Sequence, residues 1–149
     1  MQERLSQDLL AAMRSRNQAR MDTIRQIKAA VTNQEVQQGS PLSDAQVEEI
    51  IGRLVRQHRE SIEMFGKGNR QELVAKEKTE LDVLLAYLPP QFTAQQLAVM
   101  VSEAAAQVGA HGPGDKGKVM GKLMPQVKGK AEGKLVNDIV TEVLAKLAG

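Results

Sequence analysis

The chain has 149 residues, of which 42% are hydrophobic, 26% are charged and only 2% are aromatic. It has no cysteine, which excludes disulfides, thiolate metal sites and cysteine nucleophiles and suits a reducing compartment. A net charge of +2 is too small to indicate a nucleic-acid binder by itself. No apolar run approaches the roughly 18 residues of a membrane span, and the polar start does not resemble a secretory or transit peptide. We expect a cytoplasmic protein without a membrane segment.

Apolar residues recur with helical spacing along almost the whole chain. A first short helix contains Leu5 and Leu9, and a second helix, capped by Asn17, ends near residue 39. Ser43 and Gln46 form a capping box that opens a third, strongly amphipathic helix. The apolar stripe predicted for this third helix is Val47, Ile50, Ile51, Leu54, Val55, Ile62 and Phe65.

A fourth helix is expected from about residue 70 to residue 87. It must stop at Leu88-Pro89-Pro90, because proline has no N–H to donate and crowds the preceding turn. We place a domain boundary there. Residues 1–90 form an N-terminal helical domain in this interpretation, and residues 91–149 form a C-terminal helical domain.

The C-terminal domain starts with a second capping box, Thr93 and Gln96, and its first helix closes at Gly109. A loop then leads to a short helix that Asp115 caps and Pro125 terminates. The last helix covers about residues 131–147. No stretch alternates as a strand would, so the predicted fold class is all-α, an N-terminal helical bundle followed by a small three-helix subdomain.

The most informative segment is 115–136, which holds six lysines and four glycines against two acids. Residues 1–92 have nine arginines and four lysines against thirteen acids, whereas residues 93–149 have seven lysines against five acids. Lysine charge and accessible backbone N–H groups suit a polyanion, and the adjoining helix N-termini would add their dipoles. The predicted RNA-binding residues are Lys118, Lys122, Lys128, Lys130, Lys134, Gly117, Gly129 and Gly133.

This segment has no aromatic side chain, which favours recognition of the backbone and shape of a folded RNA over stacking on single-stranded bases. The structural alternative is a solvated surface on which the glycines only cap and break helices. A second possible basic surface is formed by cations at helical spacing in the first domain. These cations are Arg20, Arg25 and Lys28 on one helix, and Arg53, Arg56 and Arg59 on the next.

Three other patterns favour structural readings. Residues 112–119 nearly reproduce a nucleotide P-loop, but Val119 stands where a Ser or Thr must hold magnesium, and a helix rather than a strand precedes them. His58 and His111 have no metal-ligand spacing, so we predict no metal and no cofactor. Glu77 lies on the inward side of its helix, where it could pair with Arg25 or Arg59.

Three segments resemble the YqeY-like proteins of the GatB/YqeY family, which are related to the tail domain of the GatB component of the glutamyl/aspartyl-tRNA amidotransferase. The first is Arg20-Met-Asp-Thr-Ile-Arg-Gln-Ile-Lys-Ala-Ala, the second extends from Arg59 to Pro90, and the third contains Gly117-Lys-Val-Met-Gly-Lys-Leu-Met and Lys128-Gly-Lys-Ala-Glu-Gly-Lys-Leu-Val-Asn. The resemblance implies an all-α protein of two subdomains and a module that contacts tRNA.

We therefore expect a non-catalytic accessory module that binds tRNA or another structured RNA. The chain lacks a cysteine, a Ser-rich amidase loop and an ATP site, so any glutamine-dependent carbon–nitrogen ligase activity would come only from the resemblance and not from residues of this chain. Two alternatives stay open. The protein could be a component of an amidotransferase complex, or an adaptor that docks on an aminoacyl-tRNA synthetase or amidotransferase.

Overall fold

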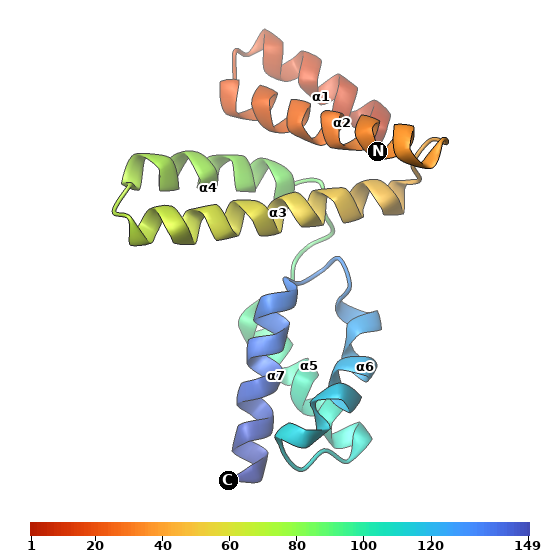
Figure 1. The fold of residues 1–149 in the computed structure, drawn as a ribbon, viewed down its shortest axis with the longest axis vertical. Coiled ribbons are helices and arrows are strands. Elements are labelled where there is room, and N and C mark those ends of the chain that lie inside the picture. The colour runs from red at the N-terminus through yellow and green to blue at the C-terminus, as the bar shows by residue number, and fades with distance from the viewer. The chain divides into compact units, whose positions relative to one another are not determined.

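A computed structural model describes residues 1–149 and confirms the all-helical fold. The chain divides into two compact units, Met1–Pro89 (unit 1) and Pro90–Gly149 (unit 2). The helices are α1 (Gln2–Arg14), α2 (Gln18–Gln38), α3 (Asp44–Lys67), α4 (Gln71–Leu85), α5 (Ala94–Val108), α6 (Lys116–Val127) and α7 (Gly133–Ala148), with a short 3-10 helix, η1, at Pro113–Asp115 (Figure 1).

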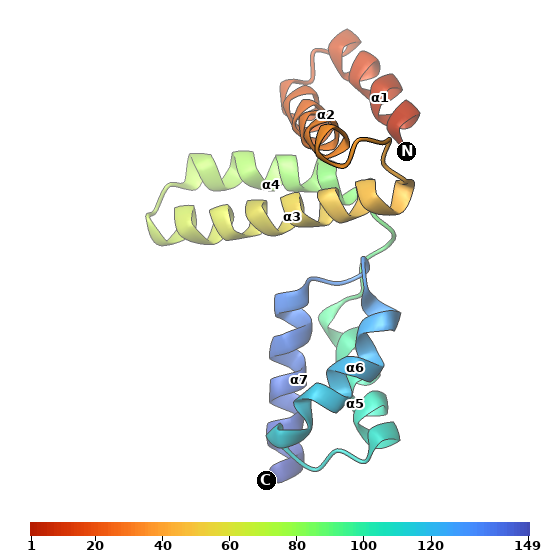
Figure 2. The ribbon, with the colours of Figure 1, turned by 45° about the vertical axis from the view of Figure 1, so that its right-hand side comes forward.

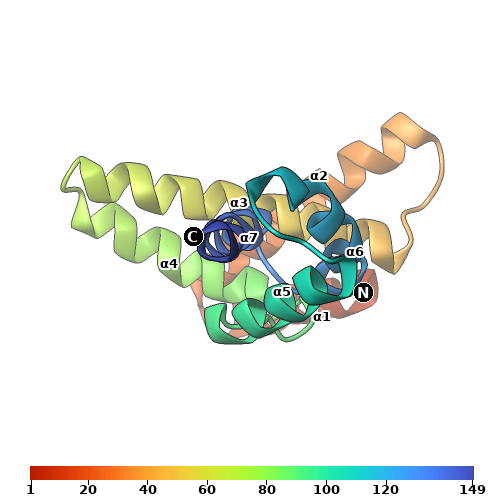
Figure 3. The same ribbon diagram turned by 90° about the horizontal axis from the view of Figure 1, so that it is seen from below.

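Unit 1 consists of two helical hairpins, α1–α2 and α3–α4. The helices of the second hairpin run side by side over most of their length in Figures 1, 2 and 3. Helix α2 packs against both α3 and α4, which joins the hairpins. Fully or almost fully buried side chains from all four helices meet in one apolar core: Leu5, Ile24, Ile27, Val31, Val47, Ile51, Leu54, Val55, Leu84 and Tyr87.

Local capping explains where two of these helices begin. The Asn17 side chain accepts a hydrogen bond from the backbone N–H of Arg20 at 3.1 Å, as predicted for the start of α2. The predicted capping box of α3 is also confirmed. Ser43 accepts from the backbone N–H of Gln46, and the Gln46 side chain accepts from that of Ser43.

A polar cluster fastens α1 to the end of α4. The Tyr87 hydroxyl donates to Oδ2 of Asp8 at 2.5 Å, and the Arg4 guanidinium lies 4.6 Å from the centroid of the Tyr87 ring. Arg4 also donates to the carbonyl of Ala86 at 3.3 Å. Burial and the bond to Asp8 raise the pKa of Tyr87 to about 12, so this hydroxyl stays a hydrogen-bond donor.

Unit 2 is a three-helix subdomain of α5, α6 and α7. The predicted capping box of Thr93 and Gln96 opens α5, and Gly109, at φ 68°, closes it. Buried side chains of all three helices form the core: Leu97, Val101, Ala104, Ala105, Val119, Leu123, Val127, Val136, Ile139, Val140 and Leu144. Val119, the residue at the magnesium position of the P-loop-like pattern, lies in this core with no exposed surface.

Two sequence predictions about α6 are wrong. Pro125 does not terminate the helix, which continues to Val127 with a hydrogen bond from the N–H of Lys128 to the carbonyl of Met124 at 3.0 Å. Proline removes one donor, but near a carboxyl end the following amides still reach their carbonyls. The side chain of Asp115 does not cap α6 either. It turns back to accept from the N–H of His111 at 2.8 Å.

Candidate nucleic-acid interface

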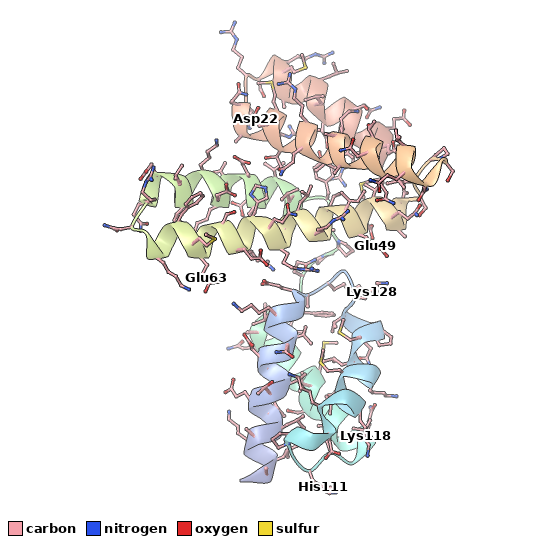
Figure 4. The ribbon with its side chains drawn as sticks, viewed as in Figure 1. Asp22, Glu49, Glu63, His111, Lys118 and Lys128 are labelled. Atoms are coloured by element: carbon pink, nitrogen blue, oxygen red, sulfur yellow. The ribbon has the colours of Figure 1, made fainter.

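The five lysines predicted to bind RNA fall into two groups on unit 2. Lys118 and Lys122 lie one turn apart on α6, so they share a face of this helix. Lys128, Lys130 and Lys134 lie at the carboxyl end of α6, in its connection to α7 and in the first turn of α7. Figure 4 shows Lys118 and Lys128 at opposite ends of α6. The five lysines therefore extend along α6 and its connection instead of converging on one compact cradle.

All five lysine side chains are exposed. The ammonium groups of Lys122 and Lys130 make no ion pair or hydrogen bond within the protein. Lys118 lies 3.8 Å from Oδ1 of Asp115, and its charge is thereby partly offset. The hydrogen bond from the backbone N–H of His111 is the main cause that lowers the pKa of Asp115, and Lys118 acts in the same direction. Asp115 is therefore an anion at neutral pH.

The connection between α6 and α7 is held by the first residues of unit 2. The backbone N–H of Phe92 donates to the carbonyl of Lys130 at 2.8 Å, and the Gln91 side chain donates to the carbonyl of Gly129 at 3.0 Å. Gly129 has φ 77°, in the left-handed region where other residues are strained. Gly129 is therefore required by the turn, which presents Lys128 and Lys130 on a fixed backbone.

Some of the backbone donors near the lysines are already used. The N–H of Lys128 bonds to Met124, and that of Lys130 bonds to the carbonyl of Val127 at 2.8 Å. The first turn of α7 differs, because its N-cap residue, Glu132, makes no side-chain cap. Leading N–H groups of a helix have no partner within the helix, so that of Gly133 is an available donor.

Gly117, Gly121 and Gly133 have no packing reason to be glycine. A Cβ added at any of them would meet no atom within 4 Å, and none has a positive φ. Glycine inside a helix costs about 0.5–1 kcal/mol relative to alanine. The two glycines of α6, which are one turn apart like the lysines that follow them, therefore weaken the helix without any gain in packing inside the protein.

The second basic surface is partly neutralised within unit 1. Arg20 lies 3.5 Å from Oδ1 of Asp8, and the ammonium of Lys28 donates to the Ser6 hydroxyl at 2.6 Å. Three cations of these two helix faces are exposed and make no ion pair: Arg25, Arg53 and Arg56.

The structure also shows a buried polar pair that the sequence did not reveal. His58 is 6% exposed, and its Nδ1 contacts the carboxylate of Glu77, while its Nε2 lies 3.2 Å from Oε1 of Gln26. The sequence suggested Arg25 or Arg59 as partners of Glu77. The only sign in the sequence that His58 is buried was its position one turn after Leu54, along the apolar stripe of α3.

No three His, Asp or Glu side chains are arranged so that they could hold a metal ion. No helix combines the length and the apolar character needed to cross a bilayer.

Comparison with known proteins places nearly the whole chain in one family. The sequence model of the family described as "Yqey-like protein" matches residues 2–144. The chain belongs to the YqeY-like family. This result bears out the resemblance drawn from the three sequence segments, and it includes both units of the YqeY-like fold.

The YqeY-like chain is similar to fungal proteins named "Altered inheritance of mitochondria protein 41, mitochondrial". It is 37% identical over 97 residues to the one from Eremothecium gossypii, which covers 63% of this chain and 53% of the fungal protein. The protein from Lachancea thermotolerans is 34% identical over 85 residues, and this match covers 56% of this chain and 46% of that protein. The protein from Pyrenophora tritici-repentis is 32% identical over 123 residues, and this match covers 81% of this chain and 67% of that protein. The chain thus spans about half the length of the first two relatives.

Proposed function

We propose that this YqeY-like protein is a non-catalytic accessory module that binds tRNA or another structured RNA. The observation that carries the proposal is the run of exposed lysines on α6 and its connection to α7. Two of these, Lys122 and Lys130, have no acid partner. Cations that are exposed, unpaired and held on an ordered backbone can neutralise phosphates without first losing other contacts.

The lysines extend over a length of α6 that suits a nucleic-acid strand. Between Lys118 and Lys128 the chain advances ten residues, which is about 15 Å along a helix axis. One strand of a duplex carries a phosphate about every 3.4 Å along its axis. The distance between these two lysines therefore matches several successive phosphates of one strand rather than a single small anion.

The start of α7 supplies a second kind of contact. Its leading N–H groups, beginning with that of Gly133, are not capped by a side chain. A helix N-terminus carries a partial positive charge and free donors, both of which favour a phosphate. Since the segment has no aromatic side chain, recognition rests on the backbone and shape of the RNA.

The proposal places the module in the cytoplasm. Two other functions are alternatives to this proposal, and the experiments described below distinguish them from it. One is a component of a glutamine-dependent carbon–nitrogen ligase complex, and the other is an adaptor that docks on a synthetase or amidotransferase through protein contacts alone.

A salt series on the full chain with bulk tRNA separates these functions. We expect log K to fall against log salt with a slope of about −3 to −5, because several lysines release counterions from phosphates. Absence of tRNA binding, or binding that does not depend on salt, would instead favour the protein adaptor. Glutamine-dependent turnover by the purified chain would support the ligase component and contradict a non-catalytic module.

The glycines of α6 provide a sharper test, because folding and binding should respond with opposite signs. We expect Gly121→Ala to stabilise unit 2 by about 0.5–1 kcal/mol through helix propensity. We also expect it to weaken tRNA binding, because the added methyl group keeps the strand away from the helix backbone. Thermal unfolding by circular dichroism and the tRNA salt series measure the two effects.

Gly66→Ala is the matched control, since Gly66 lies in α3 with the same open surroundings. This variant should be stabilised and should bind tRNA like the wild-type protein. If Gly121→Ala left tRNA affinity unchanged, close approach of RNA to α6 would be wrong.

A further inference from the structure

Exposed apolar side chains gather on the first hairpin of unit 1. The protein exposes seven large hydrophobic residues, and α1 and α2 carry three of them: Leu10 at 53%, Met13 at 47% and Val36 at 76%. A single exposed apolar side chain needs no explanation, whereas a group of them marks a contact surface. Whether these three act together depends on the face of the hairpin on which they lie.

Helical spacing places Leu10 and Met13 on one side of α1. Leu10 follows Ser6 by four residues and Met13 follows Leu10 by three, so the three side chains form one stripe. The Lys28 ammonium of α2 donates to the Ser6 hydroxyl at 2.6 Å, which brings this stripe beside α2. Asp8, whose carboxylate fastens α1 to the end of α4, lies on the other side of α1.

The matching stripe of α2 extends from Arg25 to Val36. Val36 follows Arg25 by eleven residues, which is three turns of helix, and Lys28 lies one turn after Arg25. Because α1 and α2 are antiparallel, Leu10 lies level with about residue 24 of α2 when Ser6 lies level with Lys28. The face therefore presents Leu10 at one end and Val36 at the other, about 18 Å apart along the helices, with Lys28 between them.

The two cations of this face are not neutralised within the protein. Arg25 is exposed and makes no ion pair or hydrogen bond, and the Lys28 ammonium bonds only to the uncharged Ser6. Two acids border the face, Glu3 on α1 and Asp22 on α2, but neither of them forms an ion pair. Two positive charges are therefore available to a ligand with carboxylates.

A small cavity opens between α1 and α2 beside these cations. It has a volume of about 50 Å³ and is lined by Gln2, Leu5, Lys28, Val31 and Thr32. A water molecule takes about 30 Å³ in the liquid, so the cavity has room for one small group. Lys28 supplies a positive charge and Thr32 a hydroxyl, and this combination suits a carboxylate.

We propose that this face of the α1–α2 hairpin binds an acidic amphipathic helix of a partner protein. Apolar side chains of that helix contact Leu10 and Met13 at one end and Val36 at the other. Carboxylates between them pair with Arg25 and Lys28. The apolar contacts are separated by about three turns of the bound helix, which lies along the groove between α1 and α2.

The charges favour this occupant over two others. A second copy of the chain, bound through the same face about a two-fold axis, would bring Lys28 against its own counterpart and so oppose like charges. A helix that lies on an anionic membrane has its apolar residues together and its cations on the opposite, polar face. Here Lys28 lies between the apolar ends, where acidic side chains of a helix can reach it.

Selection of peptides on the full chain tests the proposal. The probe is a displayed library of helical peptides, about sixteen residues long and randomised on one face. We expect the selected peptides to carry Asp or Glu between two apolar positions. Arg25→Glu should bind them at least about tenfold more weakly, because opposite charges become like charges. Replacing the contacting acid of the peptide by lysine should restore binding to Arg25→Glu and weaken binding to the wild-type protein.

Arg53→Glu is the matched control, since it reverses one exposed, unpaired charge on α3 of the same unit. It should bind the peptides like the wild-type protein. Leu10→Ser and Val36→Ser should each weaken binding by about tenfold through the loss of an apolar contact. All four side chains are exposed, so the fold should survive, which circular dichroism can verify. A library that yields no binder, or binders that do not distinguish Arg25→Glu from Arg53→Glu, would overturn the proposal.

Three further measurements identify a different occupant. Binding to phosphatidylserine vesicles that Leu10→Ser abolishes would assign the face to a membrane. A dimer in sedimentation equilibrium that Val36→Ser dissociates would assign it to a second copy. Loss of tRNA affinity in Arg25→Glu but not in Arg53→Glu would assign it to RNA. Each of these results would overturn the acidic helix, and the tRNA site on unit 2 would still be judged by its own variants.

Discussion

Changing Lys128, Lys130 and Lys134 together to glutamine should reduce the affinity for bulk tRNA strongly and make the remaining binding less sensitive to salt. Each lysine that neutralises a phosphate contributes close to one unit to the salt slope. The slope should therefore become shallower by about two to three units. All three side chains are exposed, so the fold should survive, which circular dichroism can verify.

A charge-matched control distinguishes a local site from the general attraction of a basic protein. Lys67→Gln, Lys76→Gln and Lys78→Gln remove the same charge from exposed positions of unit 1. This variant should keep nearly the wild-type slope. If both triple variants lost the same affinity, net charge rather than the α6–α7 connection would account for binding. If tRNA binding were weakened only by changing Arg53 and Arg56 together to glutamine, the surface of α3 would be the interface.

The second large effect concerns folding. Leu84→Ala should lower the free energy of unfolding of unit 1 by about 2–5 kcal/mol, because Leu84 is fully buried in its apolar core. Domains of this size have only about 5–15 kcal/mol in total, so the loss is large. Tyr87 is the only tyrosine and the chain has no tryptophan, so tyrosine fluorescence during urea unfolding reports on unit 1 alone.

Leu144→Ala is the corresponding change in the core of unit 2. It should leave the midpoint of the Tyr87 fluorescence transition unchanged and shift a separate transition seen by circular dichroism. Equal shifts of the Tyr87 transition in both variants would show that the two units unfold together. A cost below about 1 kcal/mol for Leu84→Ala would contradict the place of Leu84 in the core.

The helices could be predicted because their signals are local. The capping boxes at Ser43 and Thr93 involve side chains within three residues of each other, and apolar spacing identifies the buried face. Pro125 misled the prediction because a proline near the carboxyl end of a helix removes one donor without removing those that follow. The structure thereby extends α6 to Val127 and moves Lys128 to its end.

The non-local features could not be predicted. The contact of His58 with Glu77 joins residues from two helices, and no spacing in the sequence specifies it. The arrangement of the lysines depends on where α6 ends, so only the structure shows that they extend along α6 and its connection to α7. Gly117 and Gly129 looked alike in the sequence. Only the structure shows that Gly129 is required by its positive φ, whereas Gly117 is free of any packing demand.

NMR titration of the full nitrogen-15-labelled chain with bulk tRNA tests the proposed interface most directly. We expect the amide signals of residues 116–135 to shift or broaden first, with smaller changes on α5 and none on the α3–α4 hairpin. The changes should reverse when salt is raised, since counterion release drives the binding. Changes confined to unit 1, or no change at any tRNA concentration in low salt, would contradict the account.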